Sequence, residues 1–211
     1  MNNNIVTIID YRHGNLSSVK NAFLREGCNV KISHRKSDIQ SSSHIILPGV
    51  GSFSSGMDVL KESGLDEILH EEVVINQKPI LGICLGMQLF CESSEEGLEG
   101  HNKGFGWIHG KVKKLNNSKD KIPHMGWNTL TRVKDSVIIR DNNQKQISNK
   151  EHFYFVHSYA LDIKSKDTVF NCDYGGGFSA AVEKDNIFGV QFHPEKSQTP
   201  GSEIIKNFIS I

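Results

Sequence analysis

The fold is decided by the stretch PILGICLGMQ, residues 79–88. Residues 79–83 form a short apolar run typical of a buried strand, and the residues after Cys84 have the spacing of a helix. Cys84 therefore occupies a strand-to-helix turn. Such a turn holds a nucleophilic side chain clear of the sheet, and Gly82 and Gly86, two residues to either side, relieve crowding against the backbone.

The helix after Cys84 can activate its thiol. Its first turn presents unpaired N–H groups and the positive end of the helix dipole to the sulfur, which favours the thiolate and supplies donors for an oxyanion. Taken alone, this motif favours a buried structural thiol, because free cysteine is among the most buried residue types.

A second motif, QFHPE at residues 191–195, favours catalysis. It follows the strand-like run 187–190, so His193 and Glu195 stand at a strand end, and two strand ends converge on one edge of a sheet. We predict that Cys84 is the nucleophile, that His193 takes and returns its proton, and that Glu195 orients the imidazole.

Strand-like runs and helical patterns alternate through the first half of the chain, which predicts a doubly wound, mostly parallel α/β sheet. The expected strands are residues 5–9, 30–33, 44–47 and 79–83, and the expected helices are 16–25 and 57–74. Closer strand signals predict antiparallel additions at 110–115, 129–133, 137–139, 168–172 and 178–182, before a last helix at 201–209. No linker or repeat is visible, so we expect one domain over residues 1–211.

Composition excludes several classes of function. The 24 acidic and 24 basic residues cancel, so no overall charge attracts nucleic acid. The four cysteines lack paired metal spacing, and neither a signal peptide nor a long apolar span is visible. We expect a cytoplasmic protein without metal, cofactor or membrane contact.

These motifs resemble the triad-bearing, class I glutamine amidotransferases and, within them, the glutaminase subunits of imidazole glycerol phosphate synthase. The cysteine and His-Pro-Glu motifs mark the class, and the resemblance covers nearly the whole chain. The motifs that narrow it are residues 10–16, 47–53, 123–128 and 154–159. Two residues depart from the family pattern: Arg12 stands where glycine is common, and His109 where proline is common.

The resemblance implies a flavodoxin-like fold and the hydrolysis of L-glutamine to glutamate and ammonia through a glutamyl thioester. The ammonia would pass through a channel to a cyclase (synthase) subunit, in a heterodimer that serves L-histidine biosynthesis. Free ammonia would be protonated in neutral water and lose its nucleophilic lone pair, so a sheltered route is chemically sensible. A domain of this size needs another chain to use its ammonia.

The resemblance also assigns an oxyanion loop. The run 48–51 follows the apolar strand 44–47, and Gly49 and Gly51 allow unusual backbone orientations. Backbone N–H groups of Val50 and Leu85 would hold the tetrahedral intermediate. We hypothesise that the loop rests in an unproductive orientation and flips when the loaded partner binds. An ordinary strand-ending turn is the alternative.

Four residues are candidates for binding glutamine. Gln88 lies one helical turn after Cys84, on the same face as the thiol. Ser158 and Tyr159 resemble the segment whose backbone engages the amino-acid end of the substrate. Glu96 is a candidate for the substrate amine, although it lies in an acidic stretch of a kind that is often a solvated turn.

By the same resemblance, the partner would contact Asn15, Trp127, Asn128, Tyr154 and Lys196. An exposed aromatic anchor fits the general composition of interfaces. For Trp127 the alternative is a core aromatic.

The motifs leave other functions open. A paralogous glutaminase would feed ammonia to a sugar amidotransferase of surface-polysaccharide synthesis. The glutaminase of pyridoxal phosphate synthesis shares the cysteine and His-Pro-Glu motifs but is disfavoured by residues 123–128. A catalytically idle regulatory subunit and a free-standing cysteine hydrolase are the alternatives from other classes.

Overall fold

The computed structural model describes residues 4–97, 102–116, 120–141, 143, 145, 147 and 150–211. At its centre lies a parallel sheet with the strand order β2-β1-β3-β4-β13, which is the doubly wound, flavodoxin-like arrangement. Its strands are β1 (Ile5–Ile9), β2 (Asn29–Ser33), β3 (His44–Gly49), β4 (Ile80–Cys84) and β13 (Ile187–Val190). The predicted fold class is confirmed.

The sheet continues beyond β13 through antiparallel neighbours. These are β12 (Phe178–Lys184), β10 (Tyr159–Asp162) and β6 (Ile108–Lys114), and β5 (Cys91–Ser94) joins the edge parallel to β6. Strand β11 (Thr168–Cys172) pairs with β12 and with the short β8 (Thr131–Arg132). The antiparallel additions expected in the second half are therefore present, except the one at residues 137–139.

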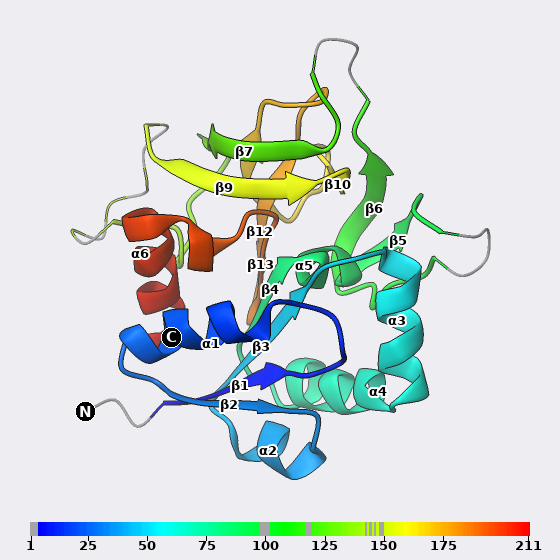
Figure 1. Ribbon diagram of the computed structural model, residues 1–211, viewed down its shortest axis with the longest axis vertical. Helices are drawn as coiled ribbons and strands as arrows, with labels where there is room; N and C mark the ends of the chain where they lie inside the picture. Colours follow the sequence, from blue (N-terminus) through cyan, green and yellow to red (C-terminus); the bar gives the residue numbers. More distant parts are fainter. Residues whose placement is uncertain are drawn as a thin grey trace.

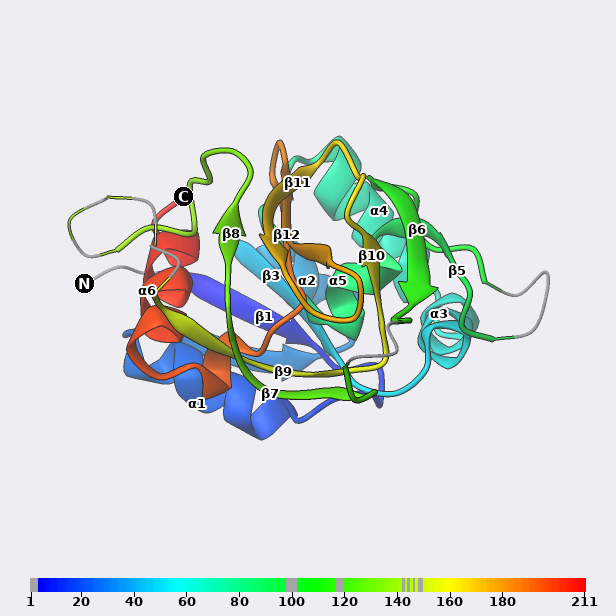
Figure 2. The ribbon, with the colours of Figure 1, turned by 90° about the horizontal axis from the view of Figure 1, so that it is seen from above.

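Helices cover both faces of the sheet (Figures 1 and 2). On one face lie α1 (Leu16–Arg25) and α6 (Gln198–Ile209), which bury Phe23 and Phe208 in one apolar cluster. On the other lie α2 (Lys36–Ser41), α3 (Phe53–Glu62), α4 (Leu65–His70) and α5 (Leu85–Leu89), which contribute to a second cluster. In the described part of the chain, every helix is too short or too polar to span a membrane.

A separate two-stranded antiparallel ribbon lies across the sheet, formed by β7 (His124–Thr129) and β9 (His152–His157) (Figure 1). Its inner face is buried: Phe153 and Phe155 are fully covered and belong to the same cluster as α1 and α6. Its outer face is open, with Met125 64% and Trp127 47% exposed. One strand therefore touches the core on one side and solvent on the other.

Two expectations were wrong. The helix expected over 57–74 is broken, because Gly64 adopts a left-handed conformation (φ 68°) between α3 and α4, and a π-helical segment η1 (Glu71–Ile75) follows. Residues 137–139 form no strand. There the Ser136 hydroxyl accepts hydrogen bonds from the N–H groups of Ile138 and Ile139, which makes a turn whose isoleucines are nevertheless buried.

Candidate active site

Cys84 ends β4 in a strained conformation, with φ 55° and ψ −110°. Positive φ is uncommon outside glycine and costs about 1–3 kcal/mol. The packing leaves no room for larger neighbours: a Cβ on Gly86 would lie 1.7 Å from the Leu47 carbonyl oxygen, and one on Gly82 would lie 2.5 Å from the Phe90 ring. The predicted elbow between two space-limited glycines is confirmed.

His193 and Glu195 form a buried pair where the chain leaves β13 for the short 3-10 helix η2 (Pro194–Lys196). Nδ1 of His193 lies 2.8 Å from Oε1 of Glu195, and the side chains are 6% and 2% exposed. Because a carboxylate accepts hydrogen bonds, Nδ1 carries the proton. Nε2 is the ring atom left for Cys84, as the predicted division of roles requires.

The charge of His193 is set by its two neighbours. Burial by itself lowers the pKa of His193, but the Cys84 sulfur and the Glu195 carboxylate outweigh burial and raise it to about 10. The imidazolium is therefore the stable form of His193 at neutral pH. Among the described residues Nε2 makes no hydrogen bond of normal geometry, a looseness common before substrate binds.

Strand β9 holds the nucleophile and the base in place. The Cys84 thiol donates to the Val156 carbonyl over 3.9 Å, and the His193 N–H donates to the Tyr154 carbonyl over 2.9 Å. The Ser197 hydroxyl donates to the His193 carbonyl (2.6 Å) and accepts from the Tyr154 N–H (3.0 Å). The backbone of one ribbon strand thus fixes both catalytic candidates.

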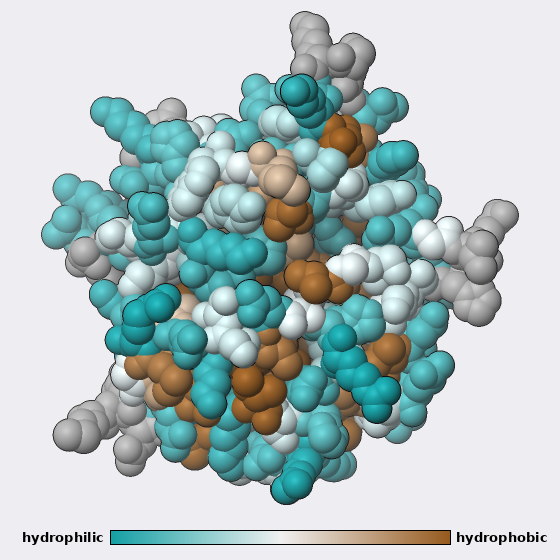
Figure 3. All heavy atoms as spheres, in the orientation of Figure 1, coloured by the Kyte–Doolittle hydropathy of each residue, from teal (hydrophilic) through white to brown (hydrophobic). Residues whose placement is uncertain are grey.

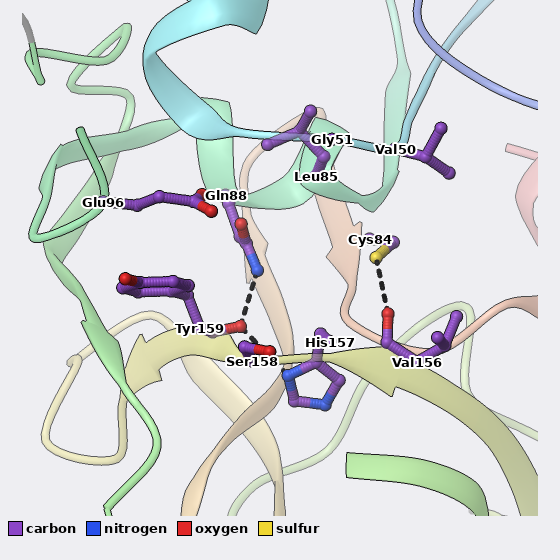
Figure 4. Close-up of a pocket in the computed structure, with 10 residues that line it drawn as sticks. All are labelled: Val50, Gly51, Cys84, Leu85, Gln88, Glu96, Val156, His157, Ser158 and Tyr159. Atoms are coloured by element: carbon purple, nitrogen blue, oxygen red, sulfur yellow. Dashed lines mark hydrogen bonds between the residues drawn. The ribbon is translucent and has the colours of Figure 1, made fainter. Parts of the chain in front are cut away.

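A cavity of about 300 Å³ opens beside the Cys84 sulfur. Figure 4 shows Val50, Gly51 and Leu85 on one side of the sulfur and the segment from Val156 to Tyr159 on the other. The volume suits a molecule of amino-acid size. Among the described residues, no group of three His, Cys, Asp or Glu side chains is arranged to hold a metal ion.

Sequence comparison gives this geometry a family. The model of the family "Glutamine amidotransferase class-I" matches residues 7–211 of the chain. The chain belongs to the class I glutamine amidotransferases.

More specific relatives are similar over nearly their full length. The amidotransferase is 45% identical to a Pelagibacter ubique protein named imidazole glycerol phosphate synthase subunit HisH, over 98% of this chain and 99% of the relative. It is 42% identical to HisH 2 of Pseudomonas aeruginosa, over 98% of this chain and all of the relative. It is therefore an enzyme, a glutamine amidotransferase subunit of the HisH kind.

Solved structures with low sequence identity share the fold. A structure described as PurLQS from Thermotoga maritima aligns with a TM-score of 0.74 at 19% identity, over 99% of this chain and 98% of that chain. One described as a glutamine amidotransferase has a TM-score of 0.72 at 15% identity, over 98% of this chain and 99% of that chain. These likenesses confirm the class I amidotransferase architecture.

The candidate oxyanion groups border the cavity. Val50 is 45% exposed and comes directly after β3, and Leu85 is the first residue of α5, so its N–H has no acceptor within that helix. Gly51 has φ 104° and lines the cavity, and Gly49 pairs with Cys84 in the β3–β4 register. The structure thus brings all four predicted residues to the elbow.

The substrate candidates also meet in the cavity, but three of them, Gln88, Tyr159 and Glu96, already make hydrogen bonds. Gln88 is buried, and its Nε2 donates to the Tyr159 carbonyl (2.8 Å), which leaves Oε1 as its group for substrate. Glu96 accepts from the Phe53 N–H at the start of α3 (2.9 Å), so this carboxylate is anchored rather than freely solvated. Ser158 lines the cavity between the two strands β9 and β10.

The five interface candidates divide into two groups. Trp127 and Tyr154 are paired across the ribbon with ring centroids 5.8 Å apart, and Lys196 Nζ lies 5.5 Å from the Tyr154 ring. Trp127 is exposed rather than a core aromatic. Asn128, in contrast, turns its amide toward His124, and Asn15 caps α1 by accepting from the Ser18 N–H.

On the face drawn in Figure 3, hydrophobic residues form small separate groups among polar ones. Large continuous apolar patches usually mark interaction sites, so this view offers no such marker of its own. The exposed pair Met125 and Trp127 on the ribbon is a local feature instead.

Sequence reasoning missed two residues that structure the site. Gln191, fully buried, accepts from Gln88 Nε2 (2.9 Å) and donates to the Cys84 sulfur (3.5 Å). Ser197 closes the ring of hydrogen bonds around His193. Both lie in or beside the predicted 191–195 motif, but nothing in the local pattern indicated which atoms they would contact.

The two departures from the family pattern have local explanations. Arg12 adopts φ 64°, a left-handed conformation that glycine takes without strain. His109 donates from its backbone N–H to Asp167 (2.8 Å), a bond that proline cannot make. Neither residue lines the cavity beside Cys84.

Proposed function

We propose that the chain hydrolyses L-glutamine to glutamate and ammonia, as the glutaminase subunit of imidazole glycerol phosphate synthase in L-histidine biosynthesis. One observation carries the chemistry: a strained cysteine elbow stands beside a buried, cationic His193 that Glu195 orients. The assignment to L-histidine biosynthesis rests on the sequence identity to proteins named HisH. The working unit is one glutamine amidotransferase domain over residues 1–211.

The first half of the reaction forms a thioester. The Cys84 thiolate attacks the side-chain amide carbon of glutamine, and the carbonyl oxygen becomes an oxyanion. The imidazolium of His193 then gives its Nε2 proton to the amide nitrogen, which leaves as ammonia. Glu195 keeps the imidazole oriented and stabilises its charged form, without itself taking a proton.

The second half releases glutamate. His193, now neutral, takes a proton from water, the resulting hydroxide attacks the γ-glutamyl thioester, and the proton returns to the Cys84 sulfur or stays on the imidazole. In both halves the N–H groups of Val50 and Leu85 stabilise the oxyanion. Loss of one such donor typically costs about 2.7–4 kcal/mol of barrier.

The cavity binds the amino-acid end of glutamine away from the sulfur. Gln88 Oε1 and the Glu96 carboxylate accept from the substrate ammonium, and the backbone of Ser158 and Tyr159 engages the carboxylate end. These groups line one wall of the same cavity, which supports a single substrate orientation.

A cyclase subunit receives the ammonia in a heterodimer. The outer face of the ribbon, with Trp127, Tyr154 and Lys196, is the docking site, together with Asn15 and Asn128. Support comes from the exposed Trp127 on β7, which pairs across the ribbon with Tyr154 on β9, the strand whose backbone holds Cys84 and His193. The four cysteines are free thiols, in keeping with a reducing cytoplasm.

The alternative partner, a sugar amidotransferase of surface-polysaccharide synthesis, is not favoured, because the similar relatives carry the name of the histidine-pathway subunit. The partner itself discriminates the two. Purified chain should bind and respond to the cyclase subunit and should ignore the sugar-amidating synthetase.

The test is glutamate release from L-glutamine by the chain alone, with the cyclase subunit, and with that subunit plus its phosphoribosyl nucleotide ligand. We expect low activity alone and a large rise in the loaded complex, because the Gly49–Val50 loop must reorient to complete the oxyanion site. Equal turnover in all three conditions would contradict partner activation. Absence of glutamate in every condition, with a folded complex, would contradict the function.

A further inference from the structure

Two buried histidines that the mechanism does not use face one another on the inner side of the ribbon. His124 on β7 and His157 on β9 are directly opposite in the strand register, and are 3% and 7% exposed. His124 Nδ1 lies 3.1 Å from His157 Nε2. His157 also lines the cavity beside Cys84 (Figure 4). Burying two imidazoles side by side calls for a physical reason.

The protons on this pair have one consistent arrangement. His157 Nδ1 lies 2.9 Å from the Tyr159 carbonyl, which only accepts, so Nδ1 donates. Nε2 of a neutral His157 is then an acceptor, and His124 Nδ1 must donate to it. That leaves His124 Nε2 as an acceptor for the Asn128 amide, 3.4 Å away.

The Asn128 amide is itself oriented. Its Oδ1 accepts from the Thr129 N–H over 2.8 Å, so Nδ2 is the atom that points to His124. All the donors in this series of hydrogen bonds, from Asn128 to the Tyr159 carbonyl, therefore point in the same direction. A directed chain of this kind needs two neutral imidazoles, each with one donor and one acceptor.

Electrostatics keep both rings neutral. Burial, followed by the neighbouring His124 and by the more distant His193, lowers the pKa of His157 to about 3 against the opposing bond to Tyr159. Burial lowers the pKa of His124 to about 4, against the opposing charge of Asp120. At neutral pH the pair therefore has the protonation that the directed chain requires.

A second chain reaches the same carbonyl from the catalytic side. Gln88 Nε2 donates to the Tyr159 carbonyl (2.8 Å) and to Gln191 Oε1 (2.9 Å), and Gln191 Nε2 donates to the Cys84 sulfur (3.5 Å). The Tyr159 carbonyl is thus the meeting point of two chains. One begins beside Trp127 on the ribbon, and the other ends at the nucleophile.

We propose that His124 and His157 are positioning residues, whose directed hydrogen bonds fix the position of the Tyr159 carbonyl at the border of the glutamine cavity. Through Gln88 and Gln191, the same carbonyl fixes the position of Cys84. The inference deepens the proposed function and rests on it. The pair also joins this border of the cavity to Asn128, next to Trp127 on the outer face, so a partner that shifts β7 shifts the same border.

Two variants separate hydrogen bonding from packing. The His124 ring stacks on Tyr174 at 3.9 Å and on Phe155 at 4.7 Å between centroids. His124→Phe keeps a stacking ring and loses the donor. His124→Asn loses the ring but keeps an amide donor close to the position of Nδ1.

The readout is the kinetics of glutamate release by the complex with the cyclase subunit. For His124→Phe we expect KM for glutamine to rise about tenfold, because the buried His157 acceptor is left unpaired and the carbonyl behind it loses its alignment; the unpaired acceptor should also lower the melting temperature. His124→Asn is expected to restore KM to within about twofold, despite a lower melting temperature. The reverse order, or equal loss in both variants, would overturn the proposal.

A second measurement does not depend on activity. In ¹⁵N-detected NMR of the wild-type chain at neutral pH, both histidines should be neutral tautomers protonated at Nδ1, with the His124→Phe spectrum assigning one of them. A ring protonated at Nε2, or a cationic ring, would overturn the proposal even in an active enzyme. If the directed tautomers are found but no glutaminase is, the function fails and the hydrogen-bond chain stands.

Discussion

The parallel strands around Cys84 and the β7–β9 ribbon that covers them are built in opposite ways. Every residue of β4 and β13 is buried, and the elbow at Cys84 tolerates no added Cβ on Gly86. In the ribbon, burial alternates, with Phe155 covered and Trp127 open. The candidate catalytic residues therefore lie on the closely packed part of the molecule, and the proposed docking site lies on the part with a free face.

The two regions meet through backbone atoms. Carbonyl groups of Tyr154 and Val156 on β9 accept from His193 and from Cys84. The side chains of β9 are thereby free to alternate between the core and the solvent. A partner that binds the ribbon can therefore influence the positions of Cys84 and His193 through the backbone of β9, without touching either side chain.

The largest expected effect is on glutamine hydrolysis at Cys84. Cys84→Ala should lower glutamine hydrolysis about 10⁴-fold or more, because no other group takes the role of the nucleophile. Synthesis by the complex with added ammonia should continue, because only the ammonia source is lost. Cys172→Ala, a matched buried cysteine on β11, should keep its activity; a similar loss there would argue that the effect is structural.

The next effect is on the stability of the parallel strands around Cys84. Gly86→Ala should lower the free energy of unfolding by about 3 kcal/mol or more, because the new methyl group overlaps the Leu47 carbonyl. Gly126→Ala in the ribbon meets no atom within 4 Å and strains only its own backbone (φ 139°), so a loss of about 1 kcal/mol is expected. Urea unfolding of both variants measures the difference, and equal losses would break the contrast.

The open face of the ribbon should behave differently from these strands. Trp127→Ala should weaken binding of the cyclase subunit about 30-fold, the loss of about 2 kcal/mol typical of an aromatic anchor, and leave the melting temperature unchanged. Titration calorimetry with purified subunits measures this. Ile75→Ala, which removes another exposed apolar side chain (67% exposed) at the last residue of η1, is the control. Equal affinity of both variants would mean that the interface lies on another surface.

A last contrast is the opposite pH dependence of the two histidines His193 and His157. The pKa of His193 is raised to about 10, so its contribution to stability is complete below its usual value near 6.5 and fades as pH rises toward 10. The pKa of His157 is lowered to about 3, so its contribution is complete above about 6.5 and fades as pH falls.

Urea unfolding across pH tests this sign. The stability gap between the wild type and His193→Gln should shrink from pH 6 to pH 9. The gap between the wild type and His157→Asn should instead shrink as pH falls from about 6.5 to 5. Gaps that are constant across pH would mean that neither ring has the charge state described above.

The same contrast explains what the sequence predicts. Strands 5–9 and 168–172 and the helix 16–25 were predicted to the residue, because buried runs and amphipathic periods leave local traces. The helix over 57–74 was not, because a single left-handed glycine interrupts an otherwise continuous apolar pattern. The strand expected at 137–139 was wrong because buried isoleucines also occur in turns.

In the site, the sequence predicted the motif residues but not the residues that hold them in position. Cys84, His193 and Glu195 were predicted by local chemistry and by family resemblance, and the structure brings them together. Gln191, Ser197 and the pair His124–His157 depend on contacts between distant segments, which no local pattern encodes. The assignment of one domain to residues 1–211 stays a prediction.

The central claim is that Cys84 forms a glutamyl thioester. Mass spectrometry of peptides from the complex, acid-quenched during turnover of L-glutamine, tests it directly. The account predicts one γ-glutamyl adduct on the peptide that contains Cys84, and none in His193→Gln. An adduct on another cysteine, or turnover without any adduct on Cys84 when deacylation is slowed, would contradict the account.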